Sequence, residues 1–489
     1  MTREYFLGID IGTQGVRAVL ADIDGFVAAT AAHSFASINS AAEPGFREQR
    51  PEDWWSAAKA AIADVVGEAA AKGFASSSIA AVSVDGTSGT VVPLGRDDRP
   101  LADGVMYNDA RGQPFLAEIR DAAKGFEKKY GLGFNASFAL PSIVWFMRER
   151  PELYEKTRTF AHQVDYIVGK LGGNFRVSDA SNALKTGYDP LAKQWAGFMS
   201  ADLGVDTAKL PDIVPPGTKI AAVSKAAAAE TGLAENTPII AGATDGYASM
   251  LASGSARPGD WTTVIGTTLV VKGVTADLRV DPEGRIYSHY HPENWWLPGG
   301  ASNCGGLFLN AAFAPDRFDG LNAKAAGLAP TGILIYPLPV KGERFPFVDP
   351  EAESFTVGDI ADPARHFLGI MESVGYAERL SFELLQSLGC EIGDSIYSAG
   401  GACRSDLWLK TRASILDRVI KIPATVDAAM GAAMLAASGH AGIPLSRAVA
   451  GMTVIDKVVE PDAEKTRIYG DFYHAFKKEC ARRFAFTPA

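Results

Sequence analysis

Apolar residues alternate with other residues in two distant parts of the chain, at 5–20 and again at 262–274. Alternation with a period of two is typical of β-strands, because successive side chains of a strand point to opposite faces. Each alternating run is interrupted by a turn that follows an isoleucine, at Gly12-Thr13 in the first run and at Gly266-Thr267 in the second. The pattern therefore predicts two β-hairpins, and their likeness indicates two similar lobes.

Strands and helices alternate through the rest of the chain. Pro51 and Asp53 are typical of a helix start, and apolar residues at helical spacing follow them. The run 239–245 is interpreted as a buried strand that ends on an acid and separates the lobes. Further strands are predicted at 79–84, 91–94, 333–337 and 396–399, and further helices at 142–171 with a break near Pro151, 225–230, 363–388 and 427–438. We therefore predict an α/β fold with an N-terminal lobe over 1–246 and a C-terminal lobe over 247–489.

Composition and charge disfavour several classes of protein. Of the 489 residues 47% are hydrophobic, and 57 acidic residues against 47 Lys and Arg give a net charge of −10. Without a basic tail, nucleic acid is not expected as a partner. The chain has no apolar run of ~18 residues and no signal-peptide pattern, so neither a membrane span nor secretion is expected. The four cysteines are scattered, as in a reducing compartment. We expect a cytoplasmic protein, with a homodimer as the default assembly.

The first Gly-Thr turn carries groups that suit a phosphate. Backbone N–H groups near Gly12, the Thr13 hydroxyl and the Gln14 amide can donate hydrogen bonds to phosphate oxygens, and Arg17 offers a planar fork. Asp10, at the end of the preceding strand, could hold Mg²⁺ through water beside the phosphates. A hairpin without a ligand favours the same residues, so this alternative stays open.

Asp245 is the candidate general base. Removing a proton from a sugar hydroxyl requires a carboxylate that faces a cleft, and strand ends in open α/β sheets point there. Its neighbours Gly242, Ala243 and Gly246 are small, so a substrate could come close. An aspartate at this position can also cap the following helix, and the two roles are compatible.

Two further patterns lie in the second half. Gly400 and Gly401 follow a strand and precede a helix that begins near Ser405. Glycines there let the backbone approach a flat ring or a phosphate, although an ordinary tight turn has the same sequence. His289 and His291 lie on one side of a possible strand, but no third metal ligand is near them in sequence.

Taken together, these motifs resemble the FGGY family of carbohydrate kinases, within the superfamily of sugar kinases, actin and heat-shock ATPases. The resemblance covers nearly the whole chain and depends on the order and spacing of several modest matches. The matching segments are 10–17 with a phosphate motif, 44–49 with Trp54-Trp55, 107–111 with an Asn-Asp-x-Arg sugar-site strand, 242–246 with the catalytic aspartate, 266–268 with a phosphate turn, 342–346, and 400–405 with 431–433 on the adenine side.

The resemblance implies two actin-like, ribonuclease H-like lobes with a central cleft. It also implies transfer of the γ-phosphoryl group of ATP, with Mg²⁺, to a terminal hydroxyl of a sugar or polyol. Asp245 would take the hydroxyl proton, and Asp10 would lie near the metal. The residues implied to line the phosphates and the nucleoside are Gly12, Thr13, Gln14, Arg17, Gly266, Thr267, Thr268, Gly400, Gly401 and Ser405.

The same resemblance favours a ketopentose as substrate. Xylulose kinases usually carry Gly-Gln-Met-His-Gly where this chain has Thr87-Ser88, which resembles ribulose kinases, and so does the segment 182–189. We therefore place D-ribulose slightly ahead of D-xylulose, and a tetritol stays possible. Glycerol is disfavoured, because the Arg-Glu pair of glycerol kinases is missing. The implied sugar contacts are Thr87, Ser88, Gly89, Asp109, Lys185 and Asp245, although Lys185 could also be a surface charge.

Two alternatives of other classes remain. The same lobes could form a non-catalytic sugar sensor, although Asp10, Asp245 and both Gly-Thr turns argue against a decayed site. An actin-like polymer or chaperone ATPase is the other, and the matches at 107–111 and 342–346 argue against it.

Overall fold

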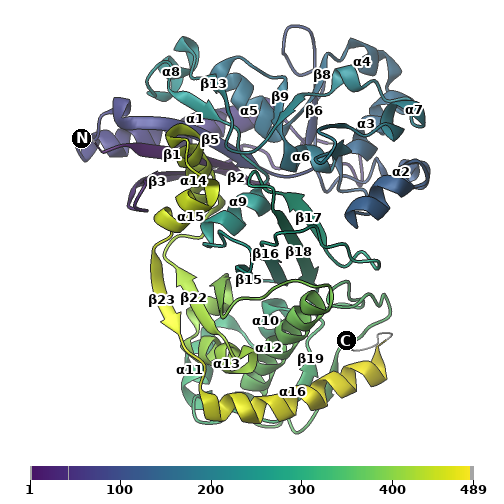
Figure 1. Ribbon diagram of the computed structural model, residues 1–489, viewed down its shortest axis with the longest axis vertical. Helices are drawn as coiled ribbons and strands as arrows, with labels where there is room; N and C mark the ends of the chain where they lie inside the picture. The colour runs from purple at the N-terminus through teal and green to yellow at the C-terminus, as the bar shows by residue number, and fades with distance from the viewer. Residues whose placement is uncertain (1–2, 42, 485–489) are drawn as a thin grey trace. The chain divides into compact units, whose positions relative to one another are not determined.

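The computed structural model describes residues 3–41 and 43–484. They divide into two compact units (Figure 1). The first unit runs to Ala252 and also contains His289–Asn294 and Thr425–Val454. The second contains Ser253–Ser288, Trp295–Ala424 and the chain from Ile455 onward. A segment from late in the sequence therefore packs within the N-terminal unit, and the lobe boundary after residue 246 stays a prediction.

A mixed sheet forms the centre of the first unit, in the order β13-β14-β5-β1-β2-β3. The predicted hairpin is confirmed: β1 pairs antiparallel with β2, while β5 and β14 extend the sheet in parallel. The strands are β1 (Tyr5–Ile11), β2 (Gly15–Asp22), β3 (Val27–Ser34), β5 (Ile79–Gly86), β13 (Lys219–Ala222) and β14 (Pro238–Ile240).

Both faces of this sheet are covered by helices. Apolar side chains of β1 share one core cluster with α1 (Pro51–Ala71), α5 (Gln163–Gly172) and α8 (Lys225–Thr231). The opposite face contacts α14 (Ala428–Ala441), which also packs on α9 (Asp245–Ala252). A Cβ at Gly8 would lie 1.8 Å from the carbonyl oxygen of Ala429. Glycine at this position therefore allows α14 to lie directly on β1.

The rest of the first unit is a second sheet, in the order β4-β7-β6-β8, with shorter elements around it. Its strands are β4 (Glu48–Gln49), β6 (Val91–Leu94), β7 (Gly104–Val105) and β8 (Thr159–His162). The other elements are α2 (Leu116–Tyr130), α3 (Ala139–Glu149), α4 (Pro151–Lys156), α6 (Ala180–Leu184), α7 (Phe198–Ala201), α15 (Leu445–Met452), β9 (Val177–Asp179), β10 (Tyr188–Asp189), β11 (Gln194–Trp195) and β12 (Asp212–Val214).

The second unit is built around another mixed sheet, in the order β17-β18-β16-β15-β21-β22-β23, although only Tyr287 and Ser288 of the edge strand β17 are assigned to this unit. Its strands are β15 (Trp261–Ile265), β16 (Leu269–Gly273), β17 (Tyr287–Tyr290), β18 (Trp296–Ser302), β21 (Ser395–Ala399), β22 (Val419–Pro423) and β23 (Ile455–Val459). The other elements are α10 (Gly306–Ala312), α11 (Phe318–Ala325), α12 (Pro363–Ser387), α13 (Asp406–Leu416), α16 (Ala463–Arg483) and the pair β19 (Leu334–Tyr336) and β20 (Phe355–Val357).

The two sheets repeat one topology. In the first, β2 and β3 extend the sheet antiparallel from β1, whereas β5 and β14 extend it in parallel and β13 closes it antiparallel. In the second, β16, β18, β21, β22 and β23 stand in the same relations to β15. The predicted α/β class with two similar halves is confirmed.

Two local predictions were wrong in detail. The strand predicted over 239–245 ends at Ile240, and Asp245 instead begins α9. The region predicted as two helices over 142–171 also contains β8, whose four residues are too few to show a period. No helix among the described residues is both long and apolar enough to cross a bilayer.

Candidate active site

Four aspartates of the first unit come from four elements. Asp10 lies near the end of β1, and Asp85 is its register partner on the parallel strand β5. Asp245 is the first residue of α9, and Asp427 caps the N-terminus of α14. Asp10 is 4% exposed and Asp85 is fully buried. The parallel pairing of β1 with β5 therefore places two carboxyl groups side by side inside the protein.

Burial dominates the electrostatics of this pair. Burial is the largest cause that raises the pKa of Asp10; a hydrogen bond with Asp85 and the charge of Arg17 oppose it, the charges of Asp245 and Asp427 add to it, and the net pKa is about 6. Burial also raises the pKa of Asp85 well above its usual value, helped by Asp10. Within the described residues no donor reaches either oxygen of Asp85 or Oδ1 of Asp10. The two carboxyls can satisfy one another by sharing a proton.

These oxygens also have the chemistry that a hard cation requires. Carboxylates suit Mg²⁺, which usually keeps several water ligands. Among the residues that the structure describes, no group of three or more His, Cys, Asp or Glu side chains could hold a metal ion directly. Asp10 with Asp85 therefore fits an ion held largely by water and phosphate, whereas His289 and His291 belong to no direct site. His291 accepts a hydrogen bond from the backbone of Glu293 instead.

The first Gly-Thr turn is anchored from behind. The Gly12 amide donates to the Gly15 carbonyl over 2.9 Å, and the Gln49 side chain donates to the Thr13 carbonyl over 2.8 Å. Gln14 is exposed. Arg17, with 63% of its side chain exposed, lies 3.4 Å from Asp10 and 3.6 Å from Asp427. Hydrogen bonds to its carbonyl groups therefore fix the turn, whereas the side chains of Gln14 and of Arg17, on β2, are exposed.

A close approach of backbones places Asp245 beside the acidic pair. A Cβ at Gly242 would lie 1.8 Å from the Val84 carbonyl oxygen, so only glycine lets this segment lie so close beside β5. Thr244 then forms a parallel bridge with Gly86. Asp245 follows at the start of α9, where its Oδ1 accepts from the Gly246 amide over 2.6 Å. Its charge is close enough to raise the pKa of both Asp10 and Asp85.

The loop after β5 contains three predicted sugar contacts in different settings. Thr87 is buried, and its hydroxyl donates to Oε1 of Gln163 over 2.6 Å. The Ser88 hydroxyl is buried and has no hydrogen-bond partner among the described residues. Gly89 has φ +91°, and a Cβ there would lie 2.2 Å from the Ser137 carbonyl oxygen. Of the two hydroxyls, only that of Ser88 has hydrogen-bonding capacity left over among the described residues, and its contact with a sugar stays a prediction.

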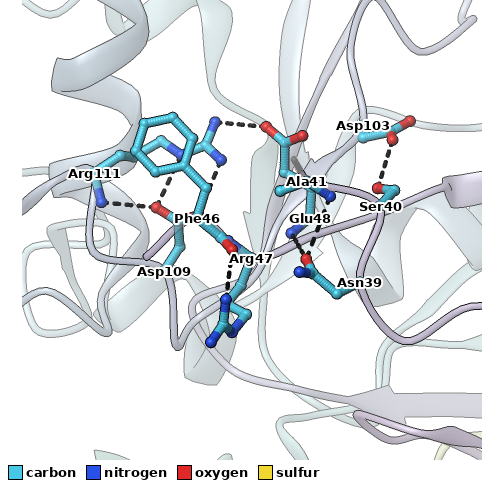
Figure 2. Close-up of polar contacts among 9 residues, drawn as sticks. All are labelled: Asn39, Ser40, Ala41, Phe46, Arg47, Glu48, Asp103, Asp109 and Arg111. Carbon is cyan, nitrogen blue, oxygen red and sulfur yellow. Dashed lines mark hydrogen bonds and ion pairs between the residues drawn. The ribbon is translucent and has the colours of Figure 1, made fainter. Parts of the chain in front are cut away.

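Asp109 is engaged by an arginine (Figure 2). Its two oxygens accept from Nε and Nη2 of Arg111 over 2.8 and 2.9 Å, and Oδ2 also accepts from the Arg47 amide. Arg111, with 2% of its side chain exposed, reaches Glu48 over 2.7 Å. The Phe46 ring centroid lies 4.2 Å from the guanidinium carbon. Asp109 thus holds a buried arginine, and its contact with a sugar stays a prediction.

Lys185 directly follows α6, whose N-terminus is capped by the buried Asp179. Its Nζ lies 5.4 Å from the ring centroid of Phe138, and its carbonyl accepts from the Leu140 amide. The side chain is partly buried, which differs from a freely solvated surface lysine.

The second unit contains a cavity of about 480 Å³, within the range of small-molecule sites. Three predicted residues line it: Gly266, Gly401 and Ser405. Ser405 caps α13 and donates to Asn322 over 2.6 Å. Gly400, with φ +93°, lies so near β15 that a Cβ would be 2.5 Å from the Ile265 carbonyl oxygen. The other lining residues are Ile265, Gly306, Leu309, Asn310, Pro315, Phe318, Asp319, Asn322, Met371, Ala402, Arg404 and Trp408.

The second Gly-Thr turn adjoins this cavity. The Gly266 amide donates to the Thr268 carbonyl, and the Gly306 and Leu307 amides at the start of α10 donate to the Gly266 and Thr267 carbonyls. The turn and the cavity therefore share one rim, which suits a flat apolar group joined to an anionic chain.

Two acidic residues of the site, Asp85 and Asp427, have no role predicted from the sequence. Asp85 precedes the Gly86-Thr87 loop, and Asp427 precedes a helix of small residues. An aspartate at a strand end, or at a helix start, was the available signal in each case. Neither signal reveals that the two acids lie near Asp10, because they are far from it in sequence.

Residues 5–252 match the N-terminal domain, and residues 259–440 the C-terminal domain, of one known family. The chain belongs to the FGGY family of carbohydrate kinases. It is 29% identical over 451 residues to a xylulose kinase of Bacillus subtilis (strain 168), covering 89% of this chain and 88% of that protein. It is 25% identical over 506 residues to a gluconokinase of Bacillus licheniformis, covering 98% and 93%.

Solved structures agree with this family. A crystal structure of xylulose kinase from Rhodospirillum rubrum has a TM-score of 0.86 and 26% identity, covering 98% of this chain and 99% of that one. The resemblance to the FGGY family and the actin-like α/β fold are confirmed. The protein is a carbohydrate kinase, and its family implies a sugar and ATP as the reactants.

Proposed function

We propose that this FGGY kinase phosphorylates a ketopentose at its terminal hydroxyl, with Asp245 as the general base. The proposal depends chiefly on the position of Asp245 at the start of α9, where its charge acts on Asp10 at the end of β1. Asp10 also precedes the turn of Gly12 and Thr13. A carboxylate and a phosphate-type turn close together are what phosphoryl transfer to an alcohol requires.

In this mechanism Asp245 accepts the hydroxyl proton as the sugar oxygen attacks the γ-phosphorus of ATP. Amides of the first turn, together with Thr13 and Arg17, stabilise the phosphate charge. The second unit binds the nucleoside in its cavity, with Gly266, Thr267 and Thr268 on the phosphate side. Asp10, with Asp85 behind it, would hold Mg²⁺, which neutralises phosphate charge when bound.

The relatives and the Thr87-Ser88 loop favour different sugars as the substrate. The relatives include xylulose kinases from several bacteria, which favours xylulose. The Thr87-Ser88 loop resembles ribulose kinases instead, which is the basis for expecting D-ribulose ahead of D-xylulose. We propose D-xylulose as the preferred substrate with D-ribulose second, because the similarity to the relatives extends over most of the chain and the loop covers only a few residues. Gluconate is the next candidate, from the gluconokinase relatives.

A coupled ADP assay across D-xylulose, D-ribulose, their L-enantiomers, gluconate, erythritol and glycerol tests the proposal. We expect ADP release that depends on a pentulose, and a rate about 10²–10⁴-fold lower for Asp245→Asn. Asp202→Asn, at the exposed end of α7, makes the same chemical change away from the site and should leave the rate unchanged.

Other outcomes identify the alternatives. If only gluconate or erythritol supports ADP release, that compound and not a pentulose is the substrate. Sugar and ATP binding without ADP formation would indicate a sensor. Undiminished turnover by Asp245→Asn would remove Asp245 from the role of base.

A further inference from the structure

Strand β4 contains only Glu48 and Gln49, which pair antiparallel with β7. Neighbouring side chains of a strand point to opposite sides. Glu48 reaches Nη1 of Arg111 over 2.7 Å, and Gln49 reaches the Thr13 carbonyl over 2.8 Å. One short strand therefore contacts both the predicted sugar-side motif and the first Gly-Thr turn.

Every polar group of the Gln49 side chain is used. Nε2 donates to the carbonyls of Thr13 and Ile38, at 2.8 and 3.1 Å, while Oε1 accepts from Nε1 of Trp54 at 2.8 Å. Gln49 is 1% exposed and Trp54 is fully buried. Because α1 holds the indole and the indole orients the amide, the position of the Thr13 carbonyl depends on the core of the unit.

On the Glu48 side, the buried Arg111 makes the corresponding contacts (Figure 2). Arg111 is held between Glu48 and Asp109, and its guanidinium lies over the Phe46 ring. The Glu48 amide donates to Oδ1 of Asn39 over 3.0 Å. A bidentate, buried arginine keeps its partners at fixed separations.

We propose that β4 is a spacer that sets the position of the first Gly-Thr turn relative to the 107–111 segment, with Gln49 and Glu48 as positioning residues for phosphoryl transfer. The inference rests on the proposed function in one respect, that the turn binds phosphate and the 107–111 segment lies on the sugar side. A misplacement of about 1 Å between reacting groups can cost on the order of a hundredfold in rate.

Hydrogen exchange of the free protein tests the mechanical part. Gln49→Met keeps the size of the side chain and removes its hydrogen bonds. We expect amide exchange in residues 11–16 to accelerate on the order of fivefold, as loss of one buried hydrogen bond would cause. Gln194→Met, on the exposed strand β11, is the matched control and should leave this segment unchanged. Equal exchange in Gln49→Met and wild type would overturn the proposal, whatever the enzyme's activity.

Kinetics test the catalytic part. Gln49→Met and Glu48→Met each remove the polar side-chain contacts on one side of β4, so each should lower kcat by at least about tenfold with KM for sugar within about twofold. The double variant should lose little more than the worse single variant, because a spacer disconnected at one side no longer positions anything. Effects that multiply, or unchanged kcat with only a lowered Tm, would contradict the spacer.

Trp54→Phe keeps the test decisive if Gln49→Met does not fold. It retains an aromatic ring, removes the donor to Gln49 together with part of the buried ring, and leaves the Gln49 amide able to donate to the Thr13 carbonyl. We therefore expect a smaller acceleration of exchange in residues 11–16 and a smaller loss of kcat. No change in either would overturn the proposal. Failure of the wild-type enzyme on every sugar would count against the proposed function alone, since the exchange measurement needs no substrate.

Discussion

Replacing Asp10 by asparagine should stabilise the nucleotide-free protein, and more so at high pH. Burial raises the pKa of Asp10 to about 6, above its ordinary value of 3.8. A carboxyl whose pKa rises on folding contributes stability that is complete below pH 3.8 and is lost as pH rises through about 6. Asparagine does not titrate, so the variant avoids this loss.

The pKa of Asp10 sets the magnitude. At about 1.4 kcal/mol for each pKa unit, a rise from 3.8 to about 6 corresponds to about 3 kcal/mol above neutral pH. This is an upper bound, because Asp85 shares the burial and the proton. For a unit of this size each kcal/mol moves Tm by about 2–4 °C. We therefore expect Asp10→Asn to melt up to about 10 °C above wild type at pH 8, and to differ much less at pH 4.

Calorimetry at both pH values, with a chelator present, measures the effect. Asp202→Asn is the matched control, because it makes the same chemical change at an exposed aspartate outside this acidic group. Its Tm should equal that of wild type at both pH values. The reasoning is wrong if Asp10→Asn melts below wild type at pH 8, or if its increase in Tm is the same at both pH values. Either result would mean that ionisation of the buried Asp10 does not destabilise the protein.

Three further predictions concern packing, charge and the sugar. Gly8→Ala places a methyl group 1.8 Å from the Ala429 carbonyl oxygen, so urea unfolding should show that the free energy of unfolding falls by about 3 kcal/mol or more. A decrease of less than about 1 kcal/mol would contradict the packing of α14 on β1. Glu378→Gln leaves the fully buried Arg412 without its counter-charge, so thermal unfolding should show that the free energy of unfolding falls by about 3–5 kcal/mol. An unchanged Tm would refute this role of the buried ion pair. Lys185→Met should raise KM for the sugar at least about tenfold with little change in KM for ATP, and an unchanged sugar KM would exclude Lys185 from the sugar site.

The local sequence pattern was enough for many elements. The two hairpins, α12 and α14 were predicted close to their observed bounds, because alternation, helical spacing and caps are properties of neighbouring residues. The ordered motifs also led to the family, since their spacing over most of the chain is hard to match by chance. Strand β8 was not predicted, and the short strand β14 was predicted to extend too far, because a few residues show no clear period.

The sequence by itself determined the α/β class, the two related halves, the family, and which residues were candidates for chemistry. Only the tertiary structure decided that Asp85 faces Asp10 across parallel strands, that Asp427 and α14 join the N-terminal unit, and that Asp109 is occupied by Arg111. It also decided that Gln49 supports the first turn. The reason is physical: burial, charge coupling and hydrogen bonding act between residues that are neighbours in space, and a linear pattern records neighbours only along the chain.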